Sequence, residues 1–373
     1  MSLAPEAAHA ALVVRLLLED APPRAALAAL DWSTLLRVAE RSSTLVRVVD
    51  RLAALGQQPP VFVAAAVERE RQRVREALDL VTRIEDVCAG SGIEALFPKV
   101  AQHYPDLGDD LDLLVVSRSR RVDSFLLQGL QARRKPGDLG SRIARSTTYL
   151  VEGCRTPLDI QHGRLGVAGE EGAFPALVWR ERRRVRVGEL DAFTASPEHL
   201  VVLHGVQRVY GRLGIDLGDV VAATTLVRRP GLDWPAILDT AAHLGVLPGL
   251  GAFLEYVEQI HGHLFGRPLL PAGPRSRLRL RRRGSITFRD GVYRHPMLRV
   301  NAALYARRLA AALVTRRWGT ALRVCLVPII GLARALRYVR RASRSTSATS
   351  LPAPREGGGG AIASSALPDG GGL

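Results

Sequence analysis

A run of acidic and apolar residues at 108–116, with the sequence GDDLDLLVV, constrains this chain more than any other stretch. Side chains alternate between the two faces of a β-strand, so Asp110 and Asp112 share one face. Leu111 and Leu113 share the other face, which we expect to be buried. Two carboxylates this close repel each other, and a fold tolerates them where water solvates them or a divalent cation bridges them. The run therefore predicts a strand whose acidic face is either a solvated strand start or a metal site.

The residues just upstream bring a glycine and a cation to the same place. Gly108 permits a tight turn and lets a ligand approach the backbone closely. Lys99 follows a short apolar run at 93–97, which we expect to form a strand, and its ammonium group can reach a phosphate as a point charge. The chain has only two lysines beside 50 arginines, which favours a need for a compact ammonium group here. A half-exposed lysine that only packs its stem on the fold is the alternative.

Residues 143–162 predict two further strands. The segments 143–151 and 156–162 are joined by Glu152-Gly153, which is typical of a hairpin. The second segment contains Asp159. Taken alone, an aspartate near the end of a hairpin is common and requires no functional role.

Together these residues resemble the core motif of a nucleotidyltransferase family within the DNA-polymerase-β-like superfamily. The shared pattern is a lysine, a Tyr-Pro-Asp-x-Gly turn and the run Asp-Asp-x-Asp-Leu-Leu-Val, which begin here at Lys99, Tyr104 and Asp109. The resemblance extends from about Leu30 to about Pro271, which is well over half of the chain. It implies a small mixed sheet of the nucleotidyltransferase type.

The resemblance also implies roles for individual residues. It places Asp159 on a strand beside Asp110 and Asp112, and it makes these three carboxylates the catalytic residues and the ligands of Mg²⁺. The residues that it assigns to nucleotide binding are Lys99, Gly108 and Asp109. The chain departs from the family pattern at Val100, where many members have glycine, and at Gln161, where many have histidine. The superfamily's Gly-Ser signature after the first strand is absent as well.

The function implied by the resemblance is Mg²⁺-dependent transfer of a nucleoside monophosphate from an NTP such as ATP. The acceptor is unidentified, and a small molecule, a biosynthetic intermediate and a protein hydroxyl all suit the reaction. The alternative is a catalytically inactive nucleotidyltransferase-like module that docks a membrane surface or a partner protein through a basic arm.

That basic arm follows from the distribution of charge. The net charge is +16, yet residues 1–270 have a net charge of −1 and residues 271–373 one of +17. Apolar helical runs alternate with arginines over 271–345, which predicts a basic amphipathic arm that contacts a membrane surface, an anionic partner or the protein's own body. Nucleic acid is not favoured as a partner, because the arm has few aromatic side chains on which bases could stack. The Ser-, Gly- and Pro-rich segment 346–373 predicts disorder.

The fold class that these patterns predict is α/β (α+β). A nucleotidyltransferase core sheet at 91–165 is flanked by helical regions at 1–90 and 166–270. Apolar spacing over 31–52 predicts one helix capped by Asp31, and a longer helix is expected over 61–89. We expect a polar loop at residues 131–142 and a return to helices over residues 174–270.

The cysteines and the first residues of the sequence indicate the cellular compartment of the protein. Cys88, Cys154 and Cys325 are far apart and odd in number, so they predict neither a disulfide framework nor a zinc site. The first residues lack the basic and long apolar segments of a signal peptide. The most apolar part of the arm, at 324–333, is about half the length that spans a bilayer. We therefore expect a cytoplasmic protein, with peripheral contact at the inner face of the membrane as a further hypothesis.

Overall fold

The computed structural model describes most of the chain before residue 331. The described residues are 5–19, 27–28, 30–116, 120–137, 139–166, 168–210, 214–278, 286–289, 292–294, 297–328 and 330. The chain divides into two compact units, residues 1–330 and residues 331–373. The end of the predicted basic arm, at 331–345, and the predicted disordered tail, at 346–373, lie outside the described residues.

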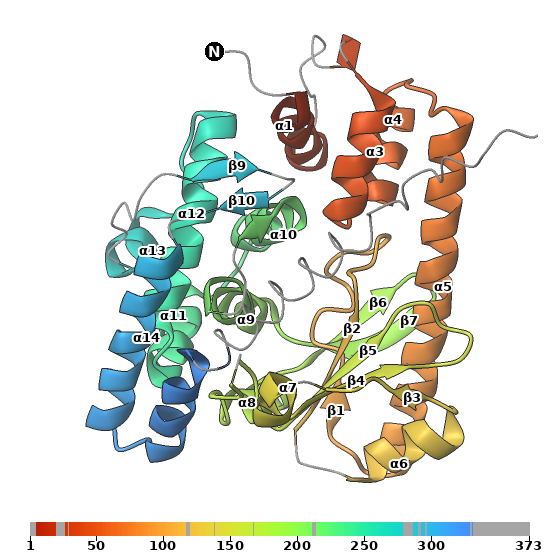
Figure 1. The fold of residues 1–373 in the computed structure, drawn as a ribbon. Helices are drawn as coiled ribbons and strands as arrows, with labels where there is room; N and C mark the ends of the chain where they lie inside the picture. Colours follow the sequence, from red (N-terminus) through yellow and green to blue (C-terminus); the bar gives the residue numbers. More distant parts are fainter. Residues whose placement is uncertain are drawn as a thin grey trace, which may run out of the picture. The chain divides into compact units, whose positions relative to one another are not determined.

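A mixed sheet of five strands, in the order β1-β2-β5-β4-β3, carries the acidic run (Figure 1). Its strands are β1 (Ala95–Leu96), β2 (Leu111–Val115), β3 (Arg133–Arg134), β4 (Ser146–Leu150) and β5 (Leu158–His162). β2 and β5 are parallel, and the other neighbouring pairs are antiparallel. The predicted α/β class with a small mixed sheet flanked by helices is confirmed.

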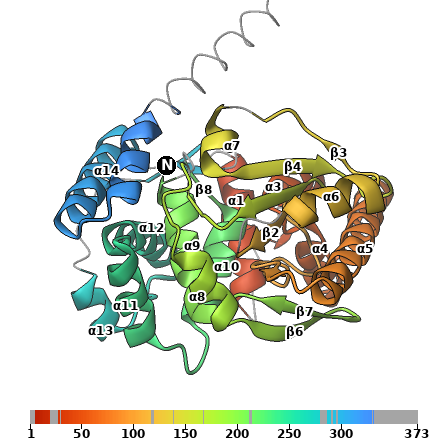
Figure 2. The ribbon, with the colours of Figure 1, turned by 90° about the horizontal axis from the view of Figure 1, so that it is seen from below.

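The alternation of side chains along β2 divides the core into two parts. Leu111 and Leu113 are buried in a cluster with α5 (Val61–Gly90) and α6 (Arg120–Gly129). Leu114 belongs to a second cluster, which includes many residues of α9 (Pro197–Tyr210). α5 and α9 lie on opposite sides of the sheet (Figure 1, Figure 2). Because Asp112 alternates with the leucines that face α5, its side chain lies on the face toward α9.

The single helix predicted over 31–52 is wrong, because the chain forms two helices there. α3 (Trp32–Arg41) begins at the predicted cap, where the Asp31 carboxylate accepts hydrogen bonds from the amides of Ser33 and Thr34 at 3.2 and 3.1 Å. α4 (Leu45–Ala54) follows after a short break. The N-terminal helix α1 (Pro5–Leu18) packs against both.

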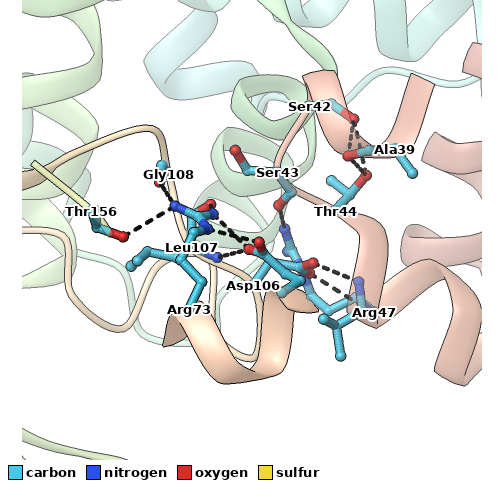
Figure 3. A network of polar contacts seen from close by, with 12 residues as sticks. Ala39, Ser42, Ser43, Thr44, Arg47, Arg73, Asp106, Leu107, Gly108 and Thr156 are labelled. Carbon is cyan, nitrogen blue, oxygen red and sulfur yellow. Dashed lines mark hydrogen bonds and ion pairs between the residues drawn. The ribbon is translucent and has the colours of Figure 1, made fainter. Parts of the chain in front are cut away.

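The break between α3 and α4 is made by polar side chains. Ser43 takes a left-handed backbone conformation with φ of 52°, and the Ser42 hydroxyl donates a hydrogen bond to the Val38 carbonyl at 2.7 Å. The carboxylate of Asp106 then accepts hydrogen bonds from the first free amides of α4, from Val46 at 2.6 Å and from Arg47 at 3.2 Å (Figure 3). A residue distant in the sequence therefore supplies the cap that lets the second helix start.

Two further stretches contain strands that the sequence analysis did not predict. The expected loop at 131–142 includes β3, which pairs with β4, and the start of α7 (Leu139–Ala144). The expected helical region contains the hairpin of β6 (Arg183–Val187) and β7 (Leu190–Thr194), and a short strand, β8 (Ile215–Asp216). Arg184 and Arg186 on β6 are exposed and alternate with Val185 and Val187, which pack against the core, so the sequence analysis overlooked a short alternation of the kind that a half-buried strand shows.

The remaining helices of this region agree with the sequence analysis. They are α8 (Phe174–Arg180), α9, α10 (Leu217–Val227), α11 (Trp234–Leu244) and α12 (Leu247–Phe265). The predicted helix start with proline in first position, at Pro197, is confirmed. So is the start at Trp234, where the Asp233 carboxylate caps α11 by accepting the Ala236 amide at 3.0 Å.

The described part of the basic arm packs on the protein's own body. Its elements are α13 (Ala272–Arg277), β9 (Thr287–Arg289), β10 (Val292–Arg294), α14 (Met297–Val314) and a helical stretch at 318–328. In α14 the buried Arg308 makes ion pairs with Glu170, at 3.0 Å, and with Glu171. Across the described ranges, no helix combines the length and the apolar character that crossing a membrane requires.

Candidate functional site

A pocket lies at the start of β2, where the chain leaves the turn before the acidic run. Five of the six predicted site residues line it, namely Lys99, Gly108, Asp109, Asp110 and Asp112. Asp109 and Asp110 are exposed, whereas Asp112 is half-buried because the strand has begun at Leu111. The sixth predicted residue, Asp159, is not in the wall of this pocket but on the neighbouring strand.

Asp159 is the direct neighbour of Asp112 in the sheet. The two residues are register partners across the parallel strands β2 and β5. Side chains of register partners lie on the same face of a sheet, so both carboxylates point toward the same side. The hydroxyls of Ser146 and Thr148, from β4, donate hydrogen bonds to Asp159 Oδ1 at 2.9 and 3.1 Å. The predicted placement of Asp159 beside the strand of Asp110 and Asp112 is confirmed.

The electrostatics of Asp159 reflect this crowding. Burial raises the pKa of its carboxyl to about 6, and the nearby charges of Asp112 and Asp110 act in the same direction, against the hydroxyl hydrogen bonds. A carboxylate that is disfavoured by like charges is stabilised when a cation binds between them. The repulsion at Asp159 is therefore the kind of strain that a bound cation would relieve.

Lys99 links the acidic residues to helix α9. Its ammonium group forms an ion pair with Asp112 and donates a hydrogen bond to Gln207 Oε1 at 3.0 Å. The turn before it is fixed by the β6–β7 hairpin, because the Pro98 carbonyl accepts hydrogen bonds from the Thr194 hydroxyl at 2.7 Å and the Ala195 amide at 3.3 Å. The lysine is thus held over the acidic face of the sheet.

The turn at Gly108 is held from the other side by a single arginine of α5. Arg73 Nη1 donates to the Gly108 carbonyl and its Nη2 donates to the Leu107 carbonyl, both at 2.8 Å (Figure 3). The adjoining Asp106 caps α4 and accepts a further hydrogen bond from Arg47 Nε at 2.8 Å. The segment that leads into the acidic run is therefore tied to two helices and held in one conformation.

The sequence analysis missed several residues of the site. Arg208, from α9, and Arg41, at the end of α3, line the pocket, and Gln207 contacts the predicted lysine. Gln161 Nε2 lies 3.5 Å from Asp112 Oδ1. One signal pointed to α9: Gln207 and Arg208 interrupt an otherwise mostly apolar helix, a pattern that indicates polar partners in the core. Their partners, Lys99 and Asp219, lie on other elements of the fold, so no local sequence pattern identifies them.

The donor chemistry of the carboxylate pair fits a magnesium ion. Among the side chains that the structure describes, no three or more His, Cys, Asp or Glu residues gather into a metal-binding group. Mg²⁺, however, is commonly held by one or two carboxylates and completes its coordination with water and substrate phosphates. Asp112 and Asp159 supply such a pair on one face of the sheet, and the charge of Asp110, just before β2, also acts on Asp159.

Comparison with known protein families places the chain among the nucleotidyltransferases, a class of transferases. The match covers residues 28–262, more than half of the chain, and the chain belongs to the family described as uncharacterised nucleotidyltransferase. Comparisons with curated proteins and with solved structures found no match. The matched residues include the five-stranded sheet, the pocket and helix α9, whereas α14 lies beyond them.

Proposed function

We propose that the chain is a Mg²⁺-dependent nucleotidyltransferase of the DNA-polymerase-β-like superfamily. It transfers a nucleoside monophosphate from an NTP to an acceptor hydroxyl and releases pyrophosphate. The observation that carries this proposal is the register pairing of Asp112 with Asp159 beside the lysine-lined pocket. The family match supports the general reaction.

In this proposal Asp112 and Asp159 hold Mg²⁺ together with Asp110. When bound, the metal ion lowers the pKa of the acceptor hydroxyl and neutralises charge on the leaving pyrophosphate. The acceptor oxygen forms a bond to the α-phosphorus as the bond from that phosphorus to the pyrophosphate oxygen breaks. Asp159 takes the proton of the acceptor hydroxyl.

The other predicted residues orient the nucleotide. Lys99 binds a phosphate oxygen, and its ion pair with Asp112 keeps the ammonium group in place before the nucleotide arrives. Gly108 lies where its lack of a side chain lets the nucleotide approach the backbone, and Asp109 lies exposed beside it at the pocket wall. Arg73 fixes the Gly108 carbonyl, so the approach surface is formed in advance.

A test is to incubate the full-length protein with each of the four NTPs, with and without Mg²⁺, and to measure NTP binding and pyrophosphate release. Asp112→Asn and Asp159→Asn should each lower turnover by at least about 100-fold, because the loss of several kcal/mol of metal-dependent stabilisation has that effect. Asp191→Asn, on the exposed side of the β6–β7 hairpin, is the matched control and should leave turnover unchanged. Absence of NTP binding and of pyrophosphate release with every nucleotide would refute the proposal.

The same labelled NTPs report on the acceptor. We propose an acceptor hydroxyl on a small molecule, a biosynthetic intermediate or a protein. With an α-phosphate label, transfer to a protein gives a labelled band on a denaturing gel, whereas transfer to a small molecule gives a labelled soluble product. Either product should disappear with Asp159→Asn.

A further inference from the structure

Among the described residues, half of the large apolar side chains that are exposed lie in one short segment at the end of α14. Leu313 and Val314, in the last turn of α14, are 44% and 83% exposed. Trp318 and Leu322, in the helical stretch that follows, are 65% and 67% exposed. We call residues 313–322 the apolar tip. Apolar surface is unfavourable in water, so this concentration of large side chains indicates a contact that covers them.

The two helices that carry the apolar tip are firmly attached to the rest of the protein. Ala312 on α14 and Ala321 on the following helix are both buried. Arg323 Nη1 donates hydrogen bonds to the Ile143 carbonyl at 2.6 Å and to the Ala168 carbonyl at 2.7 Å. The side chains of the tip therefore remain exposed although both helices are packed on the body of the protein.

The turn between the two helices has a fixed conformation and contains a cation. The Arg317 amide donates to the Ala312 carbonyl at 2.7 Å and the Arg316 amide donates to the Leu313 carbonyl at 3.1 Å, which is the hydrogen-bond pattern of a Schellman motif. Arg316 has the left-handed conformation of this motif, with φ of 54°, where glycine is usual. An arginine at this position is strained, yet it places an exposed guanidinium group inside the apolar tip.

The charge of the surrounding segment selects an anionic partner. Residues 291–330 contain seven arginines and neither aspartate nor glutamate. Close to the apolar tip, Arg307 and Arg316 are exposed and Arg317 is half-buried. A long arginine side chain can lay its methylene groups along apolar surface while its charge stays in a polar layer. The tip therefore fits a partner in which an apolar region lies directly beneath an anionic layer.

A lipid bilayer has this layered chemistry, whereas nucleic acid offers no apolar region to cover leucine and valine. Tryptophan is enriched where the headgroups of a membrane meet its hydrocarbon core, which suits Trp318 at the tip. No helix within the described ranges can span a membrane, so the contact is a shallow insertion. In Figures 1 and 2, α9 lies between α14 and the five-stranded sheet, so the tip belongs to a part of the protein separate from the pocket.

We propose that the apolar tip docks this protein on an anionic lipid bilayer. Its four large apolar side chains enter the boundary between headgroups and acyl chains, and Arg316 and Arg317 contact lipid phosphates. The contact goes beyond the proposed transferase function and does not depend on it. The family match ends at residue 262, before the tip, so the matched part of the chain does not include this surface.

The experiment is flotation of the full-length protein with phosphatidylcholine vesicles that contain or lack phosphatidylserine, at low and high salt. The wild type should bind the vesicles with phosphatidylserine, bind the neutral vesicles much less, and lose affinity as salt rises. Trp318→Ser with Leu322→Ser should weaken this binding by at least about tenfold, because two inserted apolar side chains are lost. The matched control is Val61→Ser with Phe62→Ser at the start of α5, which removes two exposed apolar side chains elsewhere and should leave binding unchanged.

A second variant tests the cation without removing apolar surface. Arg316→Gly takes away the charge and supplies the residue that the left-handed conformation favours. It should weaken binding to vesicles with phosphatidylserine by about fivefold. Its thermal unfolding temperature should equal or exceed that of the wild type, so that the loss of binding cannot be attributed to misfolding.

Loss of binding in both tip variants, with the control variant unchanged, supports the proposal whether or not the protein transfers a nucleotide. Should the double serine variant fail to fold, Arg316→Gly alone decides between these outcomes. Absence of vesicle binding by the wild type overturns the proposal. So does equal binding by the wild type and the tip variants, or equal binding to neutral and anionic vesicles. A dimer that the double serine variant dissociates, without vesicle binding by the wild type, would identify the tip as an interface between two copies of the chain.

Discussion

Asp112 on β2 and Asp159 on β5 are register partners in a parallel strand pair, although two helices and two strands of the sheet separate them in the sequence. The pairing brings two carboxylates to one face without a local turn between them. The electrostatic cost of this pairing is visible at Asp159. Burial raises the pKa of its carboxyl to about 6, and the charges of Asp112 and Asp110 contribute. An arrangement that costs stability and has no packing benefit is expected at a functional site.

The raised pKa of Asp159 predicts a stability that changes with pH. Between the usual pKa of 3.8 and about 6, the folded protein binds more protons at this group than the unfolded chain does. The contribution of this group to the free energy of unfolding is therefore most favourable below pH 4 and is lost as the pH rises through 6. Asp159→Asn cannot ionise, so it should avoid this loss of stability and raise the free energy of unfolding at pH 7.5 by about 2 to 3 kcal/mol at most. Urea unfolding at pH 4 and pH 7.5, without divalent cations, measures it.

The control for this comparison is Asp191→Asn, because Asp191 is an exposed carboxylate on β7. Its free energy of unfolding should follow that of the wild type at both pH values. Asp159→Asn that is no more stable than the wild type at pH 7.5 would show that the crowding of carboxylates carries no cost in solution.

Binding of Mg²⁺ should reverse the same cost. A ligand that binds only the folded state adds about 2.7 kcal/mol to the free energy of unfolding at a concentration 100 times its Kd. Titration of Mg²⁺ at pH 7.5 should therefore raise the thermal unfolding temperature of the wild type. Asp112→Asn and Asp159→Asn should each abolish most of this rise, and Ca²⁺, with its longer ligand distances, tests selectivity. A rise of equal size in all three proteins would place the bound ion elsewhere.

The sequence predicted the central part of this site because its signal is local. Alternation of acidic and apolar residues over 110–113 identifies the start of β2, and the two strand-forming segments around Glu152-Gly153 identify the hairpin that carries Asp159. The parallel pairing of β2 with β5 followed only from the resemblance to a family, since no local feature determines which strands become neighbours. Which residues of two parallel strands become register partners depends on the whole fold, because the strands are joined by a long crossover connection.

The parts that the sequence did not predict depend on distant residues. Apolar spacing continues from α3 into α4, so periodicity alone predicts one helix. The break between them depends on Asp106, which accepts a hydrogen bond from the amide of Val46, 60 residues away in the sequence. In strand β6 the alternation of arginine and valine extends over only four residues, 184–187, and its pairing with β7 is a backbone property. Arg208 is recognised as a site residue only by its place in the pocket wall.

The dependence of α4 on Asp106 gives a prediction about stability. Its buried carboxylate accepts hydrogen bonds from two amides of α4 and from Arg47 Nε. Asp106→Ala removes a helix cap and leaves the half-buried guanidinium group of Arg47 without its ion-pair partner, so we expect a loss of about 2 to 4 kcal/mol in the free energy of unfolding. Chemical denaturation measures it. Asp50 is exposed in the middle of the same helix, so Asp50→Ala should lower the free energy of unfolding by less than about 1 kcal/mol. Equal losses of stability in the two variants would mean that the Asp106 cap does not stabilise the fold.

The buried arginine of α14 makes the arm part of the folded body. Arg308 is 2% exposed, and its partners Glu170 and Glu171, in the segment between β5 and α8, are buried as well. Nearby, the Thr320 hydroxyl donates to the Glu170 carbonyl at 3.1 Å and Arg323 Nη1 donates to the Ala168 carbonyl at 2.7 Å. Arg308→Met would leave two buried carboxylates without this partner, which predicts a loss of about 3 to 5 kcal/mol.

The neighbouring arginine provides the comparison. Arg307 is exposed on the same helix, so Arg307→Met changes the charge of the arm equally and should alter the free energy of unfolding by less than about 0.5 kcal/mol. Urea unfolding of both variants separates the buried ion pairs from the general basicity of the arm. The triple variant Arg308→Met, Glu170→Gln and Glu171→Gln should regain part of the lost stability, because no uncompensated charge remains buried. If Arg308→Met is as stable as Arg307→Met, the ion pairs do not hold the arm on the protein. The attachment of α14 then depends on its apolar contacts and on the hydrogen bond that the Tyr305 hydroxyl donates to the Tyr210 carbonyl at 2.8 Å.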